Sequence, residues 1–407
     1  MYDVVFIGAG PASCAAATLL SQQGHSCLMV ERSKFPRYHV GESLIPQTYG
    51  TLKRLGLLKK MKKSHFPVKE SVRFVNESGK GSQPFYFSET INSEKACTWQ
   101  VERSEFDELC LENAEEKGVE VMRRTRVEKV LFDKNKKATG LAVVGPDKKN
   151  RRIKAKVVVD GSGRSTVIGR QLKLKGPVPG LKKASMWAYY KGGTRFKGRD
   201  AGETTILMIP GGGWFWYIPL PEDMFSVGVV ADPKYLFDGD EKSFESVFLR
   251  EVDKCKTLKK LLKKATRETP VRGYRTLSYW NREVSGDGWL MVGDAAAFLD
   301  PVYSSGLFLA LASGELAASS IHEALVSGDL SGEKIGAHVP ALKEGVEVVR
   351  RVIYAFYDPD FSFQKFLMTY PQHRKKLIDC LIGDVVGKNM KSFLRDLDSM
   401  SPSPAPM

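Results

Sequence analysis

The chain has 407 residues, of which 42% are hydrophobic and 27% are charged, and its formal net charge at neutral pH is +15. This composition is typical of a globular protein, and the length allows one large hydrophobic core or two joined ones. No apolar run reaches the ~18 residues of a membrane-spanning helix, and no nucleic-acid-binding motif accompanies the positive charge, so neither a transmembrane segment nor a nucleic-acid partner is expected.

The first residues predict a β-α-β unit. Residues 3–7 are a short apolar strand, residues 11–24 a helix rich in small residues, and residues 26–31 a second strand. A unit of about 30 residues is the setting that a dinucleotide-binding fingerprint requires. The unit follows Met1 directly, without a basic segment or a cleavage site, so a secretory signal peptide is not expected.

Apolar periodicity predicts strands and helices along the rest of the chain. They are, in order, a helix over 103–118, strands over 119–133, 137–145 and 151–160, a separate antiparallel sheet over 184–231, a strand entering a turn over 288–298, a long apolar helix over 307–325 and further helices over 333–398. The Pro- and Ser-rich tail from Ser401 is expected to be disordered.

Lysines are concentrated in two segments, 52–63 and 256–268. We interpret them as solvated helix faces, with a docking surface for an acidic partner or an anionic substrate as the alternative. The cysteines are scattered and the histidines lack metal-ligand spacing, so we expect neither a metal site nor a disulfide framework. Scattered cysteines suit a reducing compartment, so we expect a cytoplasmic location. The six cysteines are Cys14, Cys27, Cys97, Cys110, Cys255 and Cys380.

The loop after the first predicted strand reads GAGPAS. Its glycines allow a tight turn and a close approach to a pyrophosphate, whose charge then faces the N-terminus of the following helix. Ser13 departs from the usual Gly or Ala at the third position, and Glu31 ends the second strand, where it can accept hydrogen bonds from ribose hydroxyls. The predicted nucleotide-binding residues here are Gly8, Gly10, Pro11, Ala12, Ser13, Glu31 and Arg32.

Two further segments favour FAD over NAD. DGSGRST (160–166) and GDAAAFLDP (293–301) each follow a predicted strand. Asp294 can bond ribityl hydroxyls, and the helix after it can direct its N-terminus at the flavin ring. No second GxGxxG follows another β-α-β start, so a dedicated NAD(P)H domain is not expected, and a separate NAD(P)H-dependent flavin reductase is the expected electron donor.

In this order, the three segments resemble the FAD-dependent monooxygenase superfamily over roughly residues 1–340. The resemblance implies an α/β (α+β), para-hydroxybenzoate-hydroxylase-like fold with FAD, used as FADH2, as its cofactor. Arg103, in QVERSEFD, looks like the flavin-contacting arginine of the family. The implied parts are a Rossmann-like FAD-binding domain with interleaved strands (1–183 and 276–332), an antiparallel-sheet substrate domain (184–275), and a C-terminal helical segment with a disordered tail (333–407).

The segment GWFWYIPL (213–220) matches the W-x-W-x-I-P signature of flavin-dependent halogenases through Trp214, Trp216, Ile218 and Pro219. Alternation along a strand places both indoles on one side. The resemblance implies a catalytic role for the two tryptophans, which crowd the flavin side of a tunnel and disfavour direct oxygen transfer to an organic substrate. A core aromatic pair is the structural alternative, and related reductases carry a Y-x-W-x-F-P version.

Two further segments, residues 34–46 and 66–74, agree with this resemblance. KFPRYHVGESLIP (34–46) looks like the corresponding segment of phenol- and pyrrole-type halogenases, although some reductases share it. Lys69 stands five residues before Phe74, as the catalytic lysine does in the K-x-x-x-x-F segment of halogenases. Glu42 lies close in sequence to the flavin region and is given no role beyond holding the loop.

The segment FLDPVYSSGLF (298–308) matches F-x-x-P-x-x-S-x-G. Ser305 and Gly306 would offer backbone amides at a helix N-terminus, a site for chloride or bromide. Gly306 is also an expected contact of FAD. Tyr303 stands where the tryptophan halogenases place a glutamate, which favours the phenol, pyrrole or carrier-bound group.

The resemblance implies that reduced FAD, O2 and halide generate hypohalous acid, which migrates to Lys69. The lysine then hydrogen-bonds it or forms a haloamine beside an electron-rich ring. The substrate is a free phenol or pyrrole, or an acyl group on an acidic carrier protein. An FAD-dependent hydroxylase, a saturase resembling geranylgeranyl reductases and a non-catalytic flavin-binding protein remain as alternatives.

Overall fold

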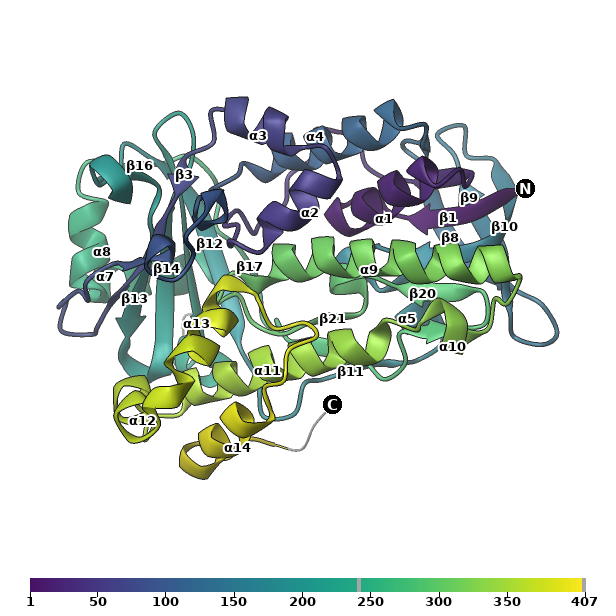
Figure 1. Cartoon of the computed structure of the whole chain (residues 1–407). Coiled ribbons are helices and arrows are strands. Elements are labelled where there is room, and N and C mark those ends of the chain that lie inside the picture. The colour runs from purple at the N-terminus through teal and green to yellow at the C-terminus, as the bar shows by residue number, and fades with distance from the viewer. Residues whose placement is uncertain (240–242, 405–407) are drawn as a thin grey trace.

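The predicted β-α-β unit lies at the centre of a largely parallel sheet (Figure 1). In this computed structural model, residues 1–239 and 243–404 are described. The strands follow the order β19 (Ser285–Gly286), β20 (Trp289–Met291), β10 (Asn150–Asp160), β1 (Tyr2–Ile7), β2 (Cys27–Val30) and β7 (Glu120–Met122). From β20 to β7 all neighbours are parallel. The carboxyl ends of β1, β10 and β20 therefore meet at one edge of the sheet.

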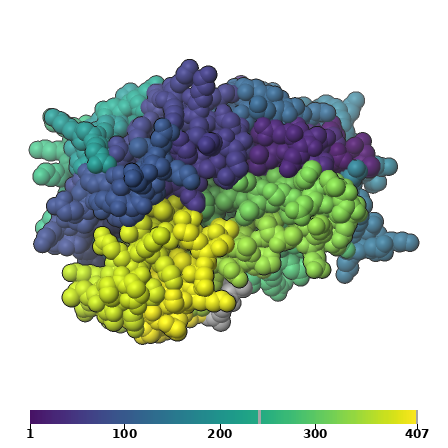
Figure 2. Space-filling model, in the orientation of Figure 1, coloured from purple at the N-terminus to yellow at the C-terminus, as the bar shows by residue number. Residues whose placement is uncertain are grey.

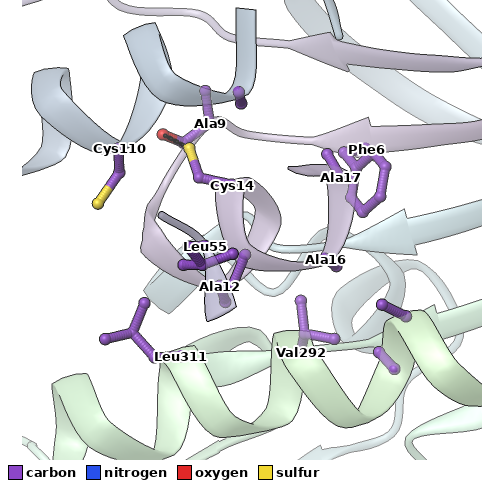
Figure 3. Close-up of a cluster of buried hydrophobic side chains, with 14 of the residues drawn as sticks. Phe6, Ala9, Ala12, Cys14, Ala16, Ala17, Leu55, Cys110, Val292 and Leu311 are labelled. Carbon is purple, nitrogen blue, oxygen red and sulfur yellow. Dashed lines mark hydrogen bonds between the residues drawn. The ribbon is translucent and has the colours of Figure 1, made fainter. Parts of the chain in front are cut away.

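Both faces of this sheet are covered, as its continuous apolar strands require. Helices α1 (Pro11–Gln22), α4 (Arg103–Glu116) and α9 (Ser305–Ser327) pack on one face, and β8 (Arg126–Phe132) and β9 (Ala138–Val144) with the short helix α5 (Val167–Gln171) pack on the other. The small residues of α1 lie against α9 so closely that a Cβ on Gly314 would be 2.2 Å from the carbonyl oxygen of Ala12. Figure 3 shows Ala12 and Ala16 of α1 facing Val292 and Leu311. α4 also packs on α1. The pair β8 and β9 extends β10 as an antiparallel ribbon.

The second large sheet contains the predicted antiparallel strands. Its order is β16 (Thr266–Arg267), β12 (Ala184–Lys191), β15 (Met224–Ala231), β14 (Gly213–Pro219), β13 (Thr204–Ile209), β4 (Ser71–Val75) and β5 (Phe85–Tyr86), with β17 (Arg272–Tyr274) beside β12. Strands β4 and β5 come from the segment 1–183, and β4 is parallel to β13. The residues 71–86 thus add to the sheet expected over 184–275, and the domain boundaries given above stay a proposal.

Short elements connect the two sheets. The small strand pairs are β3 (Val68–Lys69) with β6 (Thr98–Trp99), and β11 (Lys175–Gly176) with β18 (Tyr279–Asn281) and β21 (Ala297–Phe298). The shorter helices are α2 (Thr48–Arg54), α3 (Leu58–Lys63), α5 (Val167–Gln171), α6 (Pro233–Leu236), α7 (Phe244–Lys254) and α8 (Lys256–Leu261). The lysines of α3 and α8 are largely exposed, as expected for solvated helix faces.

The C-terminal segment is helical and packs on the second sheet. Its helices are α10 (Gly332–Ile335), α11 (Val339–Tyr357), α12 (Phe363–Thr369), α13 (Arg374–Ile382) and α14 (Lys391–Met400). Val352, Phe366 and Phe393 share a hydrophobic core with Trp214 and Trp216. Figure 2 shows this segment, in yellow, meeting N-terminal residues at the surface. The backbone amide of Gln47 donates to the carbonyl of Ile382 of α13.

The expected disorder of the tail does not extend over residues 401–404. Ser401 is buried and donates to Asp358, and the buried guanidinium of Arg350 donates to the carbonyl of Pro404. These contacts fix the described part of the tail against α11, and residues 405–407 lie outside the described residues. Across residues 1–239 and 243–404, no helix has both the length and the apolarity to cross a membrane.

Candidate active site

A groove of about 680 Å³ follows the carboxyl edge of the parallel sheet. It is formed where β1, β10 and β20 end, so the three sequence segments predicted to bind FAD come together. Every predicted cofactor residue except Ser13 lines this groove. They are Gly8, Gly10, Pro11, Ala12, Glu31, Arg32, Arg103, Asp294 and Gly306.

The glycine loop has the geometry of an anion cradle. Gly8 has a φ of +87°, and a Cβ there would lie 3.0 Å from the carbonyl oxygen of Gly161. Helix α1 begins at Pro11 without a side-chain cap, so its first backbone amides face the groove unpaired. The carboxylate of Glu31 accepts from the amides of Ala9 (2.9 Å) and Ser33 (2.7 Å) and so also holds the loop itself.

Ser13 packs between the helix and the sheet and does not reach the groove. Its side chain is fully buried, and its hydroxyl finds no hydrogen-bond partner among the described residues. A Cβ on Gly161 would lie 2.1 Å from the Ser13 Oγ. The serine is therefore accommodated because the opposing residue is a glycine.

Arg103 and Asp294 bring opposite charges to the groove. Buried Arg103 donates to both carboxylate oxygens of Asp107 (2.8 and 3.1 Å) and to the carbonyls of Val40 and Gly41. Burial raises the pKa of Asp294 to about 6, although the positive charges of Arg103 and Arg164 lower it. These charges, the open glycine loop and the groove volume fit a flavin dinucleotide.

A second cavity, of about 130 Å³, opens from the groove and contains both tryptophans of the W-x-W motif. Trp214 and Trp216 are buried, and their rings lie 6.0 Å apart on the same face of β14, as the alternation predicts. The indole Nε1 of Trp216 donates to Ser226 at 3.0 Å. That of Trp214 donates to the hydroxyl of Tyr357 at 2.8 Å.

Lys69 lies beyond the tryptophans, in a third cavity of about 20 Å³. Its side chain is fully buried, and Nζ donates to Ser43 Oγ (2.7 Å) and to the carbonyl of Leu44 (3.1 Å). No ion pair joins Lys69 to a carboxylate within the part of the chain that the structure describes. Burial alone lowers the pKa of the ammonium to about 7.

The second and third cavities share part of their walls. Four residues line both: Thr204, Ile206, Val302 and Ser304. A continuous wall thus runs from the FAD groove past the two indoles to the Lys69 ammonium. Phe74, whose spacing from Lys69 identified the lysine in the sequence, also lines the third cavity. Tyr303 lines it too, and so does Leu381, which belongs to α13.

The predicted halide segment lies at the junction of the groove and the second cavity. Helix α9 begins at Ser305, two residues before the predicted start, and has no side-chain cap. Gly306 lines both spaces, whereas the buried Ser305 lines none of these three cavities. Its neighbour Ser304 has a φ of +53° and lines the second and third cavities, although the sequence had not indicated it as a site residue.

Sequence reasoning also missed the polar partners of the site. Glu42, which received no role, is buried and lines the second cavity. Tyr357 and Asp300 reach Trp214 through a chain of two hydrogen bonds. The VGES segment gave a signal for Glu42, but nothing in the sequence indicated its partner Tyr189 or the contact between Trp214 and α11.

A family model described as an FAD binding domain matches residues 1–326. A 1H-pyrrole-2-carbonyl-(peptidyl-carrier protein) chlorinase from Pseudomonas fluorescens is 31% identical over 96% of this chain and 91% of its own. The corresponding brominase from Pseudoalteromonas luteoviolacea is 32% identical over 81% of this chain and 79% of its own. The solved structure of the flavin-dependent brominase Bmp2 is 29% identical, covers 98% of both chains and gives a TM-score of 0.87.

Proposed function

Because the chain belongs to the flavin-dependent halogenases of the FAD-binding family, we propose that it halogenates a pyrrole-2-carbonyl-type ring on a carrier protein, with Lys69 as the catalytic residue. The enzyme is FAD-dependent and uses chloride or bromide as its co-substrate. FAD, when bound and reduced, supplies the electrons that activate O2 in the groove.

The position of Lys69 carries this proposal. A lysine with an ordinary pKa is a solvated cation, whereas this one is fully buried, has no carboxylate partner among the described residues and has a pKa of about 7. In that state the group is both a hydrogen-bond donor and a nucleophilic amine. It can therefore hold hypohalous acid or accept its halogen at the end of the internal passage.

The other residues of the passage have separate proposed roles. The backbone amides of Ser305 and Gly306 hold the halide at the N-terminus of α9. Trp214 and Trp216 narrow the space between the groove and Lys69, so that hypohalous acid passes and an aromatic substrate does not reach the flavin. The ring is halogenated beside Lys69, and the cavity of about 20 Å³ lined by Phe74, Phe87 and Tyr303 has to widen to admit it, since this volume holds little more than one water molecule.

The choice of a carrier-bound substrate rests on two observations. Two relatives of similar length are named for pyrrole-2-carbonyl groups on a carrier protein. The net charge of +15 favours association with an acidic protein over a neutral small molecule. Halogenation of a free phenol or pyrrole instead of the carrier-bound group would limit the proposed substrate to an unattached ring.

We also propose that a separate NAD(P)H-dependent reductase supplies the reduced FAD, since the sequence offers one dinucleotide fingerprint. The proposed location is the cytoplasm, where the six free thiols of the chain would stay reduced.

The test is a complete reaction with product mass spectrometry. The purified chain is mixed with FAD, a flavin reductase, NADH, O2 and bromide or chloride, with pyrrolyl-loaded carrier protein and free phenols, pyrroles and indoles as substrates. We expect the halogen isotope pattern on the pyrrolyl carrier. Oxygenated product without halide would indicate a hydroxylase, and alkene reduction without O2 would indicate a saturase.

A substitution tests the role of the lysine. Lys69→Ala should abolish halogenation of the substrate while oxidation of reduced flavin continues, and Lys63→Ala, at an exposed position of α3, should retain wild-type yields. Halogenation that persists in Lys69→Ala would contradict the proposed role.

A further inference from the structure

A buried carboxyl group faces the second cavity and is not used by the roles given above. Glu42 is 2% exposed, and its carboxyl lines the cavity together with Trp214, Trp216 and Gly306. One oxygen accepts the hydroxyl of Tyr189, and the other accepts the amide of Gly41 at 3.0 Å. The carboxyl is therefore held at the flavin end of the cavity, where halide and O2 would react.

A chain of hydroxyl groups connects this carboxyl to Tyr38 in the wall of the FAD groove. Tyr189, on β12, donates to Glu42, and Tyr38 packs beside Tyr189. The rings of Tyr38 and Tyr189 meet edge to face at 5.9 Å. Tyr38 is 42% exposed and also accepts the indole N–H of Trp187. A proton that enters at Tyr38 can reach Glu42 by two transfers between adjacent groups.

The reaction of this enzyme class requires such a proton. One halide ion and one O2, with the two electrons of one FADH2, give one hypohalous acid, one water and FAD, and this conversion consumes one proton. The halide loses two electrons and O2 gains four, two from the halide and two from FADH2. The proton must reach the closed space between the groove and the indoles in every turnover.

We propose that Glu42 delivers this proton and that Tyr189 and Tyr38 reload it from solvent. Glu42 is then a catalytic acid of hypohalous acid formation, separate from Lys69, which acts on the product of that step. The inference rests on the halogenase activity of the family and not on the proposed substrate.

The surroundings of Glu42 shift the pKa of its carboxyl above the ordinary value. Burial raises its pKa, while the hydrogen bond from Tyr189, the Gly41 amide and the charge of Arg103 lower it. Neighbouring His39 is held neutral by burial, with a pKa of about 4. The titratable and charged groups around the carboxyl are Tyr38, His39, Arg103, Arg164, Tyr189, Tyr274 and Asp294.

The activity test measures hypohalous acid directly, with a 1,3-diketone trap in place of the natural substrate. Glu42→Gln keeps the shape and the hydrogen-bond acceptor but cannot carry the proton, so trapped halogen should fall by about 10²-fold. Tyr189→Phe should lower it less, and Lys63→Ala, at an exposed position, should leave it unchanged. Tyr190→Phe is the matched control, because Tyr190 lies on the same strand with its ring in the core of the opposite face.

A second measurement needs no cofactor. In FAD-free protein, the infrared difference spectrum between the wild type and Glu42→Gln should show a protonated-carboxyl band that titrates with pH, because the bands of Asp294 and Asp300 cancel in the difference. Tyr189→Phe should move this titration to higher pH, because the lost hydrogen bond stabilised the carboxylate. In the wild type, the amount of trapped halogen should fall on the alkaline side of its pH profile. This fall should move to higher pH in Tyr189→Phe and should be absent in Glu42→Gln.

Either of two results would overturn the inference. One is wild-type trapping by Glu42→Gln, and the other is an equal loss in Tyr189→Phe and Tyr190→Phe. If the wild-type protein fails to halogenate the trap while flavin is oxidised, the halogenase assignment fails as well. Trapping by the wild type that is lost only in Glu42→Gln and Tyr189→Phe supports the inference.

Discussion

The indole of Trp214 donates to the hydroxyl of Tyr357 at 2.8 Å, and this single bond joins the W-x-W strand to the C-terminal helix α11. The Tyr357 hydroxyl in turn donates to Asp300, which lies within the halide segment. Lys183 covers the Tyr357 ring at 3.6 Å. The orientation of one passage tryptophan is therefore fixed by residues from three distant parts of the chain.

Tyr357→Phe should destabilise the protein, because the substitution leaves the buried Trp214 N–H without its partner. An unsatisfied buried group costs about 1–3 kcal/mol, so the free energy of unfolding in urea should fall by roughly 2 kcal/mol. Tyr370→Phe is the control, since that hydroxyl meets only Ser399 in an exposed contact of 3.3 Å. Its effect should stay within about 0.5 kcal/mol. Equal stability of the two variants would show that the Trp214 contact does not stabilise the fold.

Lys69 should make stability depend on pH in a defined direction. Its pKa is about 7 in the folded protein and 10.5 ordinarily, so between these values the unfolded chain binds more protons. Stability therefore rises with pH across this window, and the cost of the buried charge is complete below about pH 7. Lys69→Met removes this cost, so its advantage over the wild type should be largest below pH 7. The advantage should shrink by on the order of 1.4 kcal/mol per pH unit above that.

Urea unfolding at a series of pH values measures this slope. The measured quantity is the difference in the free energy of unfolding between Lys69→Met and the wild type. Contributions of other titrating groups cancel in this difference, and the hydrogen bonds lost with Lys69 add the same amount at every pH. Lys63→Met, at an exposed position, should show no slope. A flat difference for Lys69→Met would mean that the ammonium is solvated in the folded protein.

Gly161→Ala should impair FAD binding, because the new Cβ would lie 2.1 Å from the Ser13 Oγ. Overpacking of this kind costs about 1–3 kcal/mol and would displace the glycine loop. Adding Ser13→Ala should restore both stability and FAD affinity, since the two Cβ atoms would then be 3.4 Å apart, an ordinary contact. Flavin fluorescence titration of the two single variants and the double variant measures the coupling. Additive effects would contradict a direct contact.

Gly228→Ala should displace Trp216. A Cβ at this position would meet the indole ring at 2.1 Å, so the ring has to leave its place against β15. We expect a changed near-ultraviolet circular dichroism spectrum and a loss of about 1–3 kcal/mol of stability. Gly81→Ala, where the nearest atoms lie at 3.8 and 3.9 Å, is the control. An unchanged spectrum in Gly228→Ala would show that the ring is free to move.

The FAD groove was the part of the molecule that the sequence predicted best. Gly8 and Asp294 follow short apolar strands and Asp160 ends another strand, and the rules of parallel sheets bring such positions to one edge. These signals are local, so periodicity and a few glycines were sufficient. The same reasoning misplaced Ser13, because its contact with Gly161 depends on how closely the helix lies against the neighbouring strand.

The interior of the passage could not be predicted, because it is made by contacts between residues far apart in the chain. Glu42 and Tyr189 are 147 residues apart, and Trp214 and Tyr357 are 143 apart. The burial of Lys69 follows from the pairing of β3 with β6 and from Phe74 and Leu381 closing over it. A motif identified the lysine, but only the tertiary structure gives it an altered pKa.

The order in which these parts appear along the chain has a consequence for biosynthesis. The last residue lining the FAD groove is Ala310, whereas the Lys69 cavity also needs Leu381 of α13. A chain leaving the ribosome can thus complete its cofactor groove before the chamber for the aromatic ring exists. A chain cleaved before α13 would keep every residue that lines the FAD groove but would lose one wall of the Lys69 cavity.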